Sequence, residues 1–282
     1  MTRNINLFAC LFVYRFHGII KTNIFVTGGI FMAYSIYFVR HGQTYLNRYN
    51  KIQGWCDSPL TPKGIEDGYQ AGKRLAHLNF AHAFHSDTNR AARTCRYILE
   101  ENVASAEDLT PKALPSFREQ NFGYFEGSDT SQAWLMIGAD HGCRTFNDII
   151  TKYSIEKARD FTKEADPFHD AENNAEYWQR VDQGFAYLDQ IASDGDKILL
   201  VAHSTLIRSL TSRFAPEVDI TVSPKNGSVT RFDVDDNGKI KLSYFNRYQD
   251  DAKYWYPLQK SRRACLNFLN KKFKQALLID PR

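Results

Sequence analysis

The chain has 282 residues, of which 43% are hydrophobic and 24% charged, a composition typical of a globular protein that buries a core. The formal net charge is +4, but basic residues gather at both ends, in residues 1–31 and 260–282, which leaves residues 32–259 with a net charge of −5. This distribution excludes nucleic-acid binding through a broadly basic surface, and we expect no nucleic-acid partner. Any anion site in residues 32–259 must be made by a few arginines that converge locally.

The cysteines indicate reduced thiols rather than disulfides or a metal site. The five cysteines are odd in number and widely separated, and they lack the close spacing of zinc ligands. They are Cys10, Cys56, Cys95, Cys143 and Cys265. We therefore expect a cytoplasmic protein, with no bound metal and no cofactor.

Residues 1–31 are interpreted as a leader outside the folded domain. The apolar run Leu7–Tyr14 is well short of the roughly 20 residues that a membrane-spanning helix needs. It resembles a weak signal-peptide core, but no clean small-residue cleavage site follows it, and a strand pattern begins directly after Met32. We expect Met32 to be the true start and the protein to have no stable membrane insertion, with export or membrane anchoring through residues 1–31 as the alternative.

The first half of the chain predicts alternating strands and helices. Residues 35–39 form an apolar, β-branched and aromatic run that stops at Arg40, which is typical of a buried strand that leads into a loop. A capping threonine followed by proline then predicts a helix over 61–79. Residues 81–85 resemble a strand, and residues 89–101 resemble a helix.

The second half predicts a cap followed by more strands and helices. Residues from about 128 to 171 have aromatic anchors but no strand alternation, which indicates an inserted helical cap. The predicted elements after the cap are helix 172–191, strand 197–202, helix 204–214 and strands 228–234 and 239–244. The sequence Asp235-Asp236-Asn237-Gly238 predicts a hairpin turn between the last two strands.

This alternation predicts a three-layer α/β/α sandwich with a mostly parallel central sheet and an antiparallel edge. One domain is expected over residues 32–247, with the cap inserted in it. Residues 248–282 form a basic amphipathic tail, with apolar residues at helical spacing beneath lysines. We expect this helix to pack on its own domain, with a membrane surface as the alternative.

Polar residues stand where three of the predicted strands end. The first strand ends in Arg40-His41, the strand 197–202 is followed by His203, and the strand 81–85 leads to Arg90 at the start of a helix. Ligands of open α/β sheets lie beyond the carboxyl ends of the strands, so these side chains are candidates for one site. Either histidine alone would more often be a structural residue, but two at such positions favour a site.

The two arginines favour an anion as the ligand. Arg40 interrupts an apolar run, and a buried guanidinium there needs an anionic partner. Phosphate suits the planar fork of arginine, which binds its oxygens in bidentate fashion. The alternative for Arg90 is a surface arginine paired with Asp87.

Four blocks of sequence resemble the phosphoglycerate mutase-like histidine phosphatases, in the order and spacing of that family. The resemblance covers roughly Tyr34 to Tyr244. The blocks are Arg40-His41-Gly42-Gln43-Thr44 with Asn47, Gln53-Gly54 and Asp57-Ser58-Pro59-Leu60-Thr61-Pro62-Lys63-Gly64; Ser86-Asp87-Thr88-Asn89-Arg90-Ala91 with Thr94; Arg118-Glu119-Gln120-Asn121-Phe122-Gly123-Tyr124-Phe125-Glu126-Gly127; and Val201-Ala202-His203-Ser204.

The resemblance implies a role for five residues. His41 would be the nucleophile that becomes a phosphohistidine, Arg40, Arg90 and His203 would hold the phosphoryl oxygens, and Glu119 would donate a proton to the leaving alcohol. The residue types suit this chemistry, because phosphoryl transfer depends mainly on positioning and on positive charge at the equatorial oxygens, which arginines provide without a metal. The alternative for Glu119 is a solvated loop carboxylate.

Four further residues are expected to contact phosphate or substrate: Thr44, Asn47, Gln53 and Ser204. Asn47 is equally well explained as a turn residue. Ser204 stands where the family commonly has glycine, and its hydroxyl would either enter the pocket or cap the following helix. Glu172 lies near the place of a pocket-rim glutamate of the family, although the flanking residues match poorly.

The resemblance implies a metal-independent phosphomonoester hydrolase that acts on a small phosphorylated metabolite through a phosphohistidine. The first alternative is phosphoryl transfer of the cofactor-dependent phosphoglycerate mutase type. Glycolytic mutases carry a block like Arg-His-Tyr-Gly and a basic stretch after the glutamate, whereas this chain has Gln120-Asn121-Phe122-Gly123 and then the insertion, which favours the hydrolase. The second alternative is an inactive binding module, which the presence of all five pocket residues disfavours.

Overall fold

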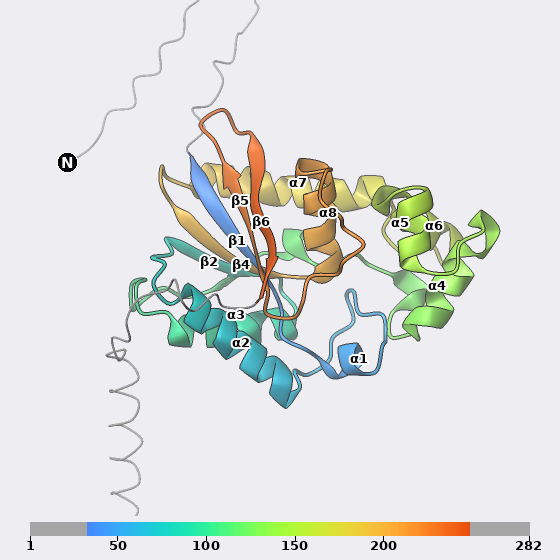
Figure 1. Cartoon of the computed structure of the whole chain (residues 1–282), viewed down its shortest axis with the longest axis horizontal. Coiled ribbons are helices and arrows are strands. Elements are labelled where there is room, and N and C mark those ends of the chain that lie inside the picture. The colour runs from blue at the N-terminus through green and yellow to red at the C-terminus, as the bar shows by residue number, and fades with distance from the viewer. Residues whose placement is uncertain (1–32, 249–282) are drawn as a thin grey trace, which may run out of the picture.

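The computed structural model describes residues 33–248, in which a six-stranded sheet lies between two layers of helices (Figure 1). The strands are β1 Tyr34–Arg40, β2 His82–His85, β3 Lys112–Ala113, β4 Lys197–Ala202, β5 Val229–Val234 and β6 Ile240–Arg247, in the sheet order β3-β2-β4-β1-β5-β6. The pairs β1–β4, β2–β4 and β2–β3 are parallel, and the pairs β1–β5 and β5–β6 are antiparallel. The predicted α/β fold, mostly parallel with an antiparallel edge, is confirmed.

Eight α-helices lie within residues 33–248. They are α1 Tyr45–Arg48, α2 Pro62–Leu75, α3 Asn89–Glu101, α4 Thr130–Gly138, α5 Phe146–Lys152, α6 Ile155–Ala165, α7 Asn174–Ile191 and α8 Ser204–Phe214. Three 3₁₀ turns accompany them, η1 Pro115–Phe117, η2 Gly123–Phe125 and η3 Ala139–His141. The sequence did not predict α1 or the two-residue strand β3.

The helix α2 begins where the sequence predicted it and ends earlier. The Thr61 side chain accepts a hydrogen bond from the Gly64 amide, and Pro62 occupies the first turn. The helix stops at Leu75 rather than near residue 79, because the Asn102 side chain donates to the carbonyls of Leu75 and Leu78 at 2.8 and 3.0 Å. A partner distant in sequence therefore sets this helix end.

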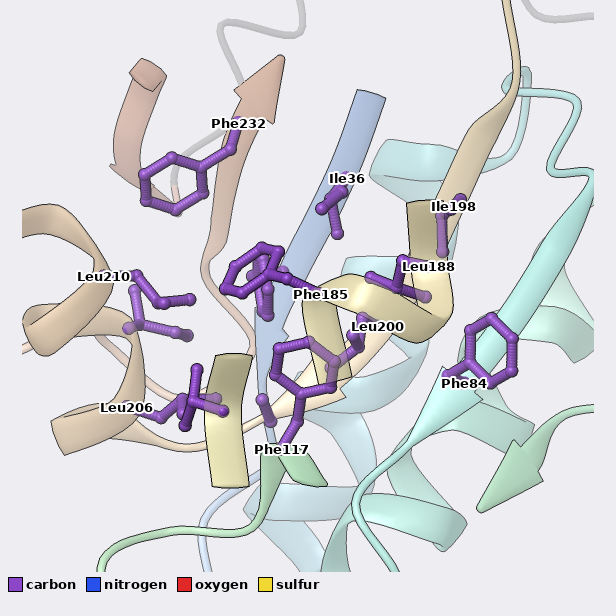
Figure 2. Close-up of a cluster of buried hydrophobic side chains, with 14 of the residues drawn as sticks. Ile36, Phe84, Phe117, Phe185, Leu188, Ile198, Leu200, Leu206, Leu210 and Phe232 are labelled. Atoms are coloured by element: carbon purple, nitrogen blue, oxygen red, sulfur yellow. The ribbon is translucent and has the colours of Figure 1, made fainter. Parts of the chain in front are cut away.

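The central strands bury side chains on both faces, as their continuous apolar sequence requires. Ile36 and Phe38 of β1 pack against α7 and α8, and Figure 2 shows part of this cluster, including Ile36, Leu200 and Phe232. Tyr37 and Val39 point to the other face, against α2 and α3. Each fully buried apolar side chain stabilises the fold by about 1.5–3 kcal/mol.

The turn between β5 and β6 is the predicted hairpin. The Gly238 amide donates to the Asp235 carbonyl at 2.9 Å, and Gly238 adopts a φ of 73°, which glycine accepts without strain. This hairpin adds the antiparallel edge to the sheet.

The cap consists of α4, α5 and α6, which lie together at one side of the sheet in Figure 1. These helices share a separate apolar core with η2 and the loop that precedes α2; among its members are Ile52, Phe122, Trp134, Ile149 and Phe161. The cap helices therefore pack against residues outside the cap, such as Ile52 and Phe122, as well as against one another.

Arg159 of α6 ties the cap to the main body. Its side chain is fully buried, donates to Asn174 Oδ1 of α7 and to Ser209 Oγ of α8, and lies 4.2 Å above the Tyr177 ring. Glu156 lies 3.9 Å from the Arg159 Nη2 atom as well, so the buried guanidinium is stabilised both by these fixed hydrogen-bond partners and by a nearby carboxylate.

The predicted leader 1–31, the start at Met32 and all but the first residue of the tail 248–282 lie outside the described residues. Between residues 33 and 248, no helix is long and apolar enough to span a bilayer.

Candidate active site

The loop that follows β1 is held in place by close backbone contacts. A Cβ atom at Gly42 would lie 2.0 Å from the Gly64 carbonyl oxygen, so only glycine allows the loop to approach the start of α2. The Gly42 amide donates to Thr94 Oγ1 at 3.0 Å, and the His41 amide donates to the Ala202 carbonyl at 3.0 Å. The end of β1 is therefore fixed against both α3 and the end of β4.

Among residues 33–248, only one nitrogen of the His41 imidazole has a hydrogen-bond partner. Its Nδ1 lies 2.8 Å from the Gly42 carbonyl oxygen, which is an acceptor only, so Nδ1 carries the hydrogen. Nε2 then keeps its lone pair, and His41 lines the pocket described below. Burial lowers the pKa of His41 well below its ordinary value, and the charges of Arg90 and Arg40 lower it further. The ring is therefore neutral and nucleophilic at neutral pH.

His203, the first residue after β4, lies beside His41, with the two ring centroids 5.2 Å apart. Both of its nitrogens have partners: Nε2 is 2.6 Å from Ser86 Oγ, and Nδ1 is 3.2 Å from Arg90 Nη2. The ring is fully buried and does not line the pocket. In this arrangement His203 orients the Arg90 guanidinium, and a direct contact with phosphate would replace one of its two hydrogen bonds.

Arg90, in the first turn of α3, is fully buried beneath the pocket. Its guanidinium donates to the carbonyls of Gly54 and Cys56 at 2.6 and 2.8 Å and pairs with Asp57 at 3.0 Å. The alternative of a surface arginine paired with Asp87 is wrong. Asp87 pairs instead with Arg118, and the Arg90 Nε atom is buried with no hydrogen-bond acceptor among residues 33–248.

Arg40 stands at the last position of β1 and reaches the pocket from the strand end. Its Nη1 donates to the Pro224 carbonyl at 2.5 Å, while its Nε is buried and finds no acceptor in the part of the chain described. Burial lowers its pKa to about 10, so the guanidinium stays charged at neutral pH. Arg40 therefore lines the pocket beside His41 with one unsatisfied donor. Arg90 also has an unsatisfied Nε, but it lies behind the pocket wall and, like His203, does not line the pocket.

Glu119 is 4% exposed, so the alternative of a solvated loop carboxylate is wrong. Its Oε1 accepts from the amides of Gln120 and Leu206 at 3.0 Å each, and its Oε2 accepts from the Thr205 amide at 2.9 Å. Burial raises its pKa, and these backbone donors and Arg90 oppose the rise without reversing it. The carboxyl group thus holds a proton more readily than an ordinary glutamate, and it lines the same pocket as His41.

The four predicted rim residues divide into two groups. Asn47, Gln53 and Ser204 line the pocket. Thr44 does not, because it is fully buried as the N-terminal cap of α1, with its Oγ1 2.5 Å from the side-chain amide of Gln53, whose NH₂ group donates to it. Asn47 completes the capping box with Thr44, so it is both a turn residue and a pocket residue.

Ser204 and Glu172 have different surroundings. The Ser204 Oγ is 2.7 Å from Ser223 Oγ and makes no helix-cap bond, so the hydroxyl belongs to the pocket wall. Glu172 does not line the pocket. It pairs with Arg180 at 2.7 Å, and Arg180 donates to the Glu119 carbonyl at 3.3 Å, which fixes the loop that carries the acid.

The pocket has a volume of about 650 Å³ and lies between the strand ends and the cap. Residues that the sequence reasoning missed also line it; among them are Trp134, Arg144, Phe146, Arg208 and Asn226. Asn226 donates to the His41 carbonyl at 2.8 Å. The position of Arg208 in the second turn of the helix that follows His203 could have indicated that it faces the pocket. No local sequence pattern indicates that Trp134, Arg144 and Phe146 of the cap do so. Over residues 33–248, no group of three or more His, Cys, Asp or Glu side chains is arranged to hold a metal ion.

Comparisons with known proteins agree with this geometry. Residues 36–137 and 136–247 match the family model of the histidine phosphatase superfamily (branch 1). The chain therefore belongs to the histidine phosphatase superfamily.

Among its relatives, a 2,3-bisphosphoglycerate-dependent phosphoglycerate mutase of Neisseria meningitidis is 28% identical over 228 residues, which cover 74% of this chain and 98% of the relative. The crystal structure of phosphoglycerate mutase from Bacillus anthracis is 28% identical, with a TM-score of 0.72 over 78% of this chain and 95% of that one. A putative alpha-ribazole-5'-P phosphatase of Escherichia coli has the same fold, at 22% identity and a TM-score of 0.54, over 76% of this chain and 96% of that one.

Proposed function

We propose that this protein hydrolyses small phosphomonoesters without a metal, through a phosphohistidine formed on His41. The observation that carries the proposal is the meeting of three groups in one pocket. These are a neutral imidazole with a free Nε2, a charged guanidinium beside it and a buried carboxyl group with a raised pKa. Each group suits one requirement of phosphoryl transfer.

In the first step, His41 Nε2 attacks phosphorus and the bond from phosphorus to the ester oxygen breaks. Arg40 and Arg90 balance the charge on the equatorial oxygens, which is the main catalytic contribution in this kind of reaction. Glu119 gives its proton to the departing alkoxide, so the alcohol leaves neutral. Oε2 accepts only one backbone hydrogen bond and therefore has the lone pair that carries this proton.

In the second step, water attacks the phosphohistidine. Glu119, now ionised, takes the proton from the water, and the bond from His41 Nε2 to phosphorus breaks to release inorganic phosphate. The three backbone amides that surround the carboxylate stabilise its ionised state between the two steps. The cycle returns both residues to their starting protonation states.

Phosphoglycerate mutase activity is the second candidate, because two of the relatives reported above are mutases at 28% identity over almost their whole length. The residues after the acid favour hydrolysis instead. Gln120 is fully buried, and the Asn121 side chain donates to the Asp170 carbonyl, so neither brings positive charge into the pocket. The segment that follows the acid therefore supplies no cation to hold a second substrate group.

The test is hydrolysis of p-nitrophenyl phosphate by the purified full chain, with and without a chelator. We expect activity that survives the chelator and is lost in His41→Ala. The matched control is His82→Ala, which removes a histidine that lies outside the pocket and contacts Asp196 at 3.6 Å, and this variant should stay active. A phosphoryl group trapped on the peptide that contains His41, stable in alkali and labile in acid, identifies the intermediate.

A second measurement separates hydrolase from mutase. The chain is incubated with 3-phosphoglycerate and a 2,3-bisphosphoglycerate primer, and both inorganic phosphate and 2-phosphoglycerate are quantified. More inorganic phosphate than 2-phosphoglycerate supports the hydrolase. More 2-phosphoglycerate than inorganic phosphate contradicts it. If His41→Ala keeps the full activity of the wild-type protein, the proposed function is wrong.

A further inference from the structure

Glu126 is a partly buried carboxylate that does not line the pocket and has no role in the proposed reaction. Four backbone amides donate to it, two to each oxygen. Oε1 accepts from Trp55 at 2.8 Å and from Phe122 at 3.0 Å, and Oε2 accepts from Gly54 at 3.0 Å and from Cys56 at 3.1 Å. An ionised carboxylate is an acceptor only, so the charged form of Glu126 suits all four contacts.

Three of these four donors are consecutive residues of one turn, residues 54–56. A Cβ atom at Gly54 would lie 2.3 Å from Glu126 Oε1 and 2.1 Å from the Gln120 carbonyl oxygen, so only glycine lets the turn approach these groups. The fourth donor, Phe122, belongs to the segment that follows the proposed acid. Glu126 therefore fixes the turn 54–56 against that segment.

The carbonyl groups of the same turn bind Arg90. The Arg90 Nη2 donates to the Gly54 carbonyl at 2.6 Å, and Nη1 donates to the Cys56 carbonyl at 2.8 Å. The Gly54 carbonyl and the Trp55 N–H are the two ends of one trans peptide bond, so they point in opposite directions. Glu126 accepts at one end of this peptide and Arg90 donates at the other. The two charges polarise the peptide in the same sense, which strengthens both hydrogen bonds.

The position of Arg90 affects the two histidines of the site. The Arg90 Nη2 also lies 3.2 Å from Nδ1 of His203, and the His203 ring is 5.2 Å from the His41 ring. Because Arg90 lies behind the pocket wall, it acts on the phosphoryl group through its charge, and this effect depends on where the guanidinium is held. Its ion-pair partner Asp57, at 3.0 Å, directly follows the turn 54–56, so a shift of the turn would move both anchors of Arg90.

We propose that Glu126 is a positioning residue for the phosphoryl transfer. It fixes the turn 54–56, and through the peptide bond between Gly54 and Trp55 it holds the Arg90 guanidinium where its charge acts on the phosphoryl group. The effect on the reaction rests on the proposed function, whereas the placement of Arg90 can be measured without any reaction.

The first test compares crystal structures of the full wild-type chain and of Glu126→Gln. Whichever way the glutamine amide turns, its NH₂ group faces two N–H donors, so two of the four hydrogen bonds are lost. We expect the turn 54–56 to shift and at least one hydrogen bond from Arg90 to its two carbonyl partners to break. If Glu126→Gln does not fold, Glu126→Asp replaces it, because it keeps the charge but shortens the side chain by one methylene group. An Arg90 that keeps both hydrogen bonds in the variant overturns the proposal.

The second test measures kcat/KM for p-nitrophenyl phosphate and glycerol 3-phosphate. Glu126→Gln should lower both by the same factor, about 10- to 100-fold, because the charge on the equatorial oxygens is common to the two esters. In an Arg90→Lys background the same substitution should cost less than about threefold, since an ammonium group lacks the fork that spans the two carbonyls. A purely structural role for Glu126 would give the same factor in both backgrounds.

The matched control is Asp166→Asn. The Asp166 carboxylate also accepts from backbone amides, those of Phe168 and Ala171 at 2.9 Å each, but it holds the end of the cap instead of the turn 54–56. It does not line the pocket. This variant should lower the free energy of unfolding in urea and change kcat/KM by less than about twofold for either ester.

Two kinetic results would also overturn the proposal. A larger loss for glycerol 3-phosphate than for p-nitrophenyl phosphate would mean that Glu126 acts through the acid, and equal losses in the wild-type and Arg90→Lys backgrounds would mean that it does not act through Arg90. Failure of the proposed function looks different. If neither ester is hydrolysed by the wild-type chain but Glu126→Gln displaces Arg90, the placement of Arg90 by Glu126 stands and the reaction is wrong. If both esters are hydrolysed and Arg90 keeps its place in the variant, the reaction stands and the positioning role is wrong.

Discussion

Replacing Glu119 by glutamine tests the proton transfer separately from phosphate binding. The amide has nearly the shape of the carboxyl group, and its oxygen can keep both hydrogen bonds that Oε1 accepts, from Gln120 and Leu206. The other end loses its partner, because an amide NH₂ would face the Thr205 N–H, a donor against a donor. The variant therefore retains two of three backbone contacts and has no proton to give.

The expected loss depends on the leaving group. An alkyl ester such as glycerol 3-phosphate expels a basic alkoxide, so the missing acid should lower kcat/KM by about 10²- to 10⁴-fold, the usual contribution of general acid catalysis. That range corresponds to about 3–5 kcal/mol of transition-state stabilisation. For p-nitrophenyl phosphate the leaving phenolate needs no proton, and the loss should stay within about tenfold, the cost of one strained hydrogen bond in the pocket.

The assay measures kcat/KM for both esters in the wild-type protein and the variant. Glu172→Gln is the matched control: Glu172 is also a buried carboxyl group near the same loop, but it pairs with Arg180 and does not line the pocket. Any loss in this control should be equal for the two esters. If Glu119→Gln lowers both esters by the same factor, Glu119 has a structural role and the assignment of the acid is refuted.

Three further outcomes are expected. With glycerol 3-phosphate, kcat/KM should persist as the pH falls below 6.5, because the pKa of His41 is lowered from that value. It should fall as the pH rises through the raised pKa of Glu119, because the acid then loses its proton. If Glu119→Gln still shows this fall at high pH, the assignment is contradicted. Gly42→Ala forces a Cβ to within 2.0 Å of the Gly64 carbonyl and should lower the free energy of unfolding in urea by about 1–3 kcal/mol or more, and an unchanged midpoint would count against the close approach. Leu200→Ala, in the fully buried β4, should cost about 2–5 kcal/mol in the same assay, and a loss below 1 kcal/mol would mean that this face is loosely packed.

The sequence predicts the elements whose signals are local. The apolar runs of β1 and β4 are long, continuous and cut off by polar residues, and the structure has them at residues 34–40 and 197–202. The hairpin at Gly238 also depends only on neighbouring residues. The sequence places a histidine at the end of each of these strands, but the parallel pairing of β1 with β4, which brings His41 and His203 side by side, comes from the structure.

The features that the sequence could not predict depend on partners far along the chain. The Glu119 carboxylate accepts hydrogen bonds from two backbone amides of α8, which lie 86 and 87 residues further along the chain. No property of the segment around Glu119 indicates these partners. Arg90 pairs with Asp57 from a loop rather than with the adjacent Asp87, because the helix turns its side chain inward beneath Gly54. The cap arginine Arg144 acquires its position only when the cap helices assemble.

The buried Arg159 has a consequence for recombining this protein with its relatives. Its guanidinium spans three helices, so a chimera that receives a foreign segment in place of residues 128–171 keeps Asn174 and Ser209 but loses the cation that both were satisfying. Asn174 Oδ1 would then lose the two hydrogen bonds that it accepts from Arg159, and Ser209 Oγ would lose one, so the graft would misfit even where its loops join well. Exchanges of substrate preference by swapping this segment therefore have to transplant Arg159 with it, or replace its two acceptors at the same time.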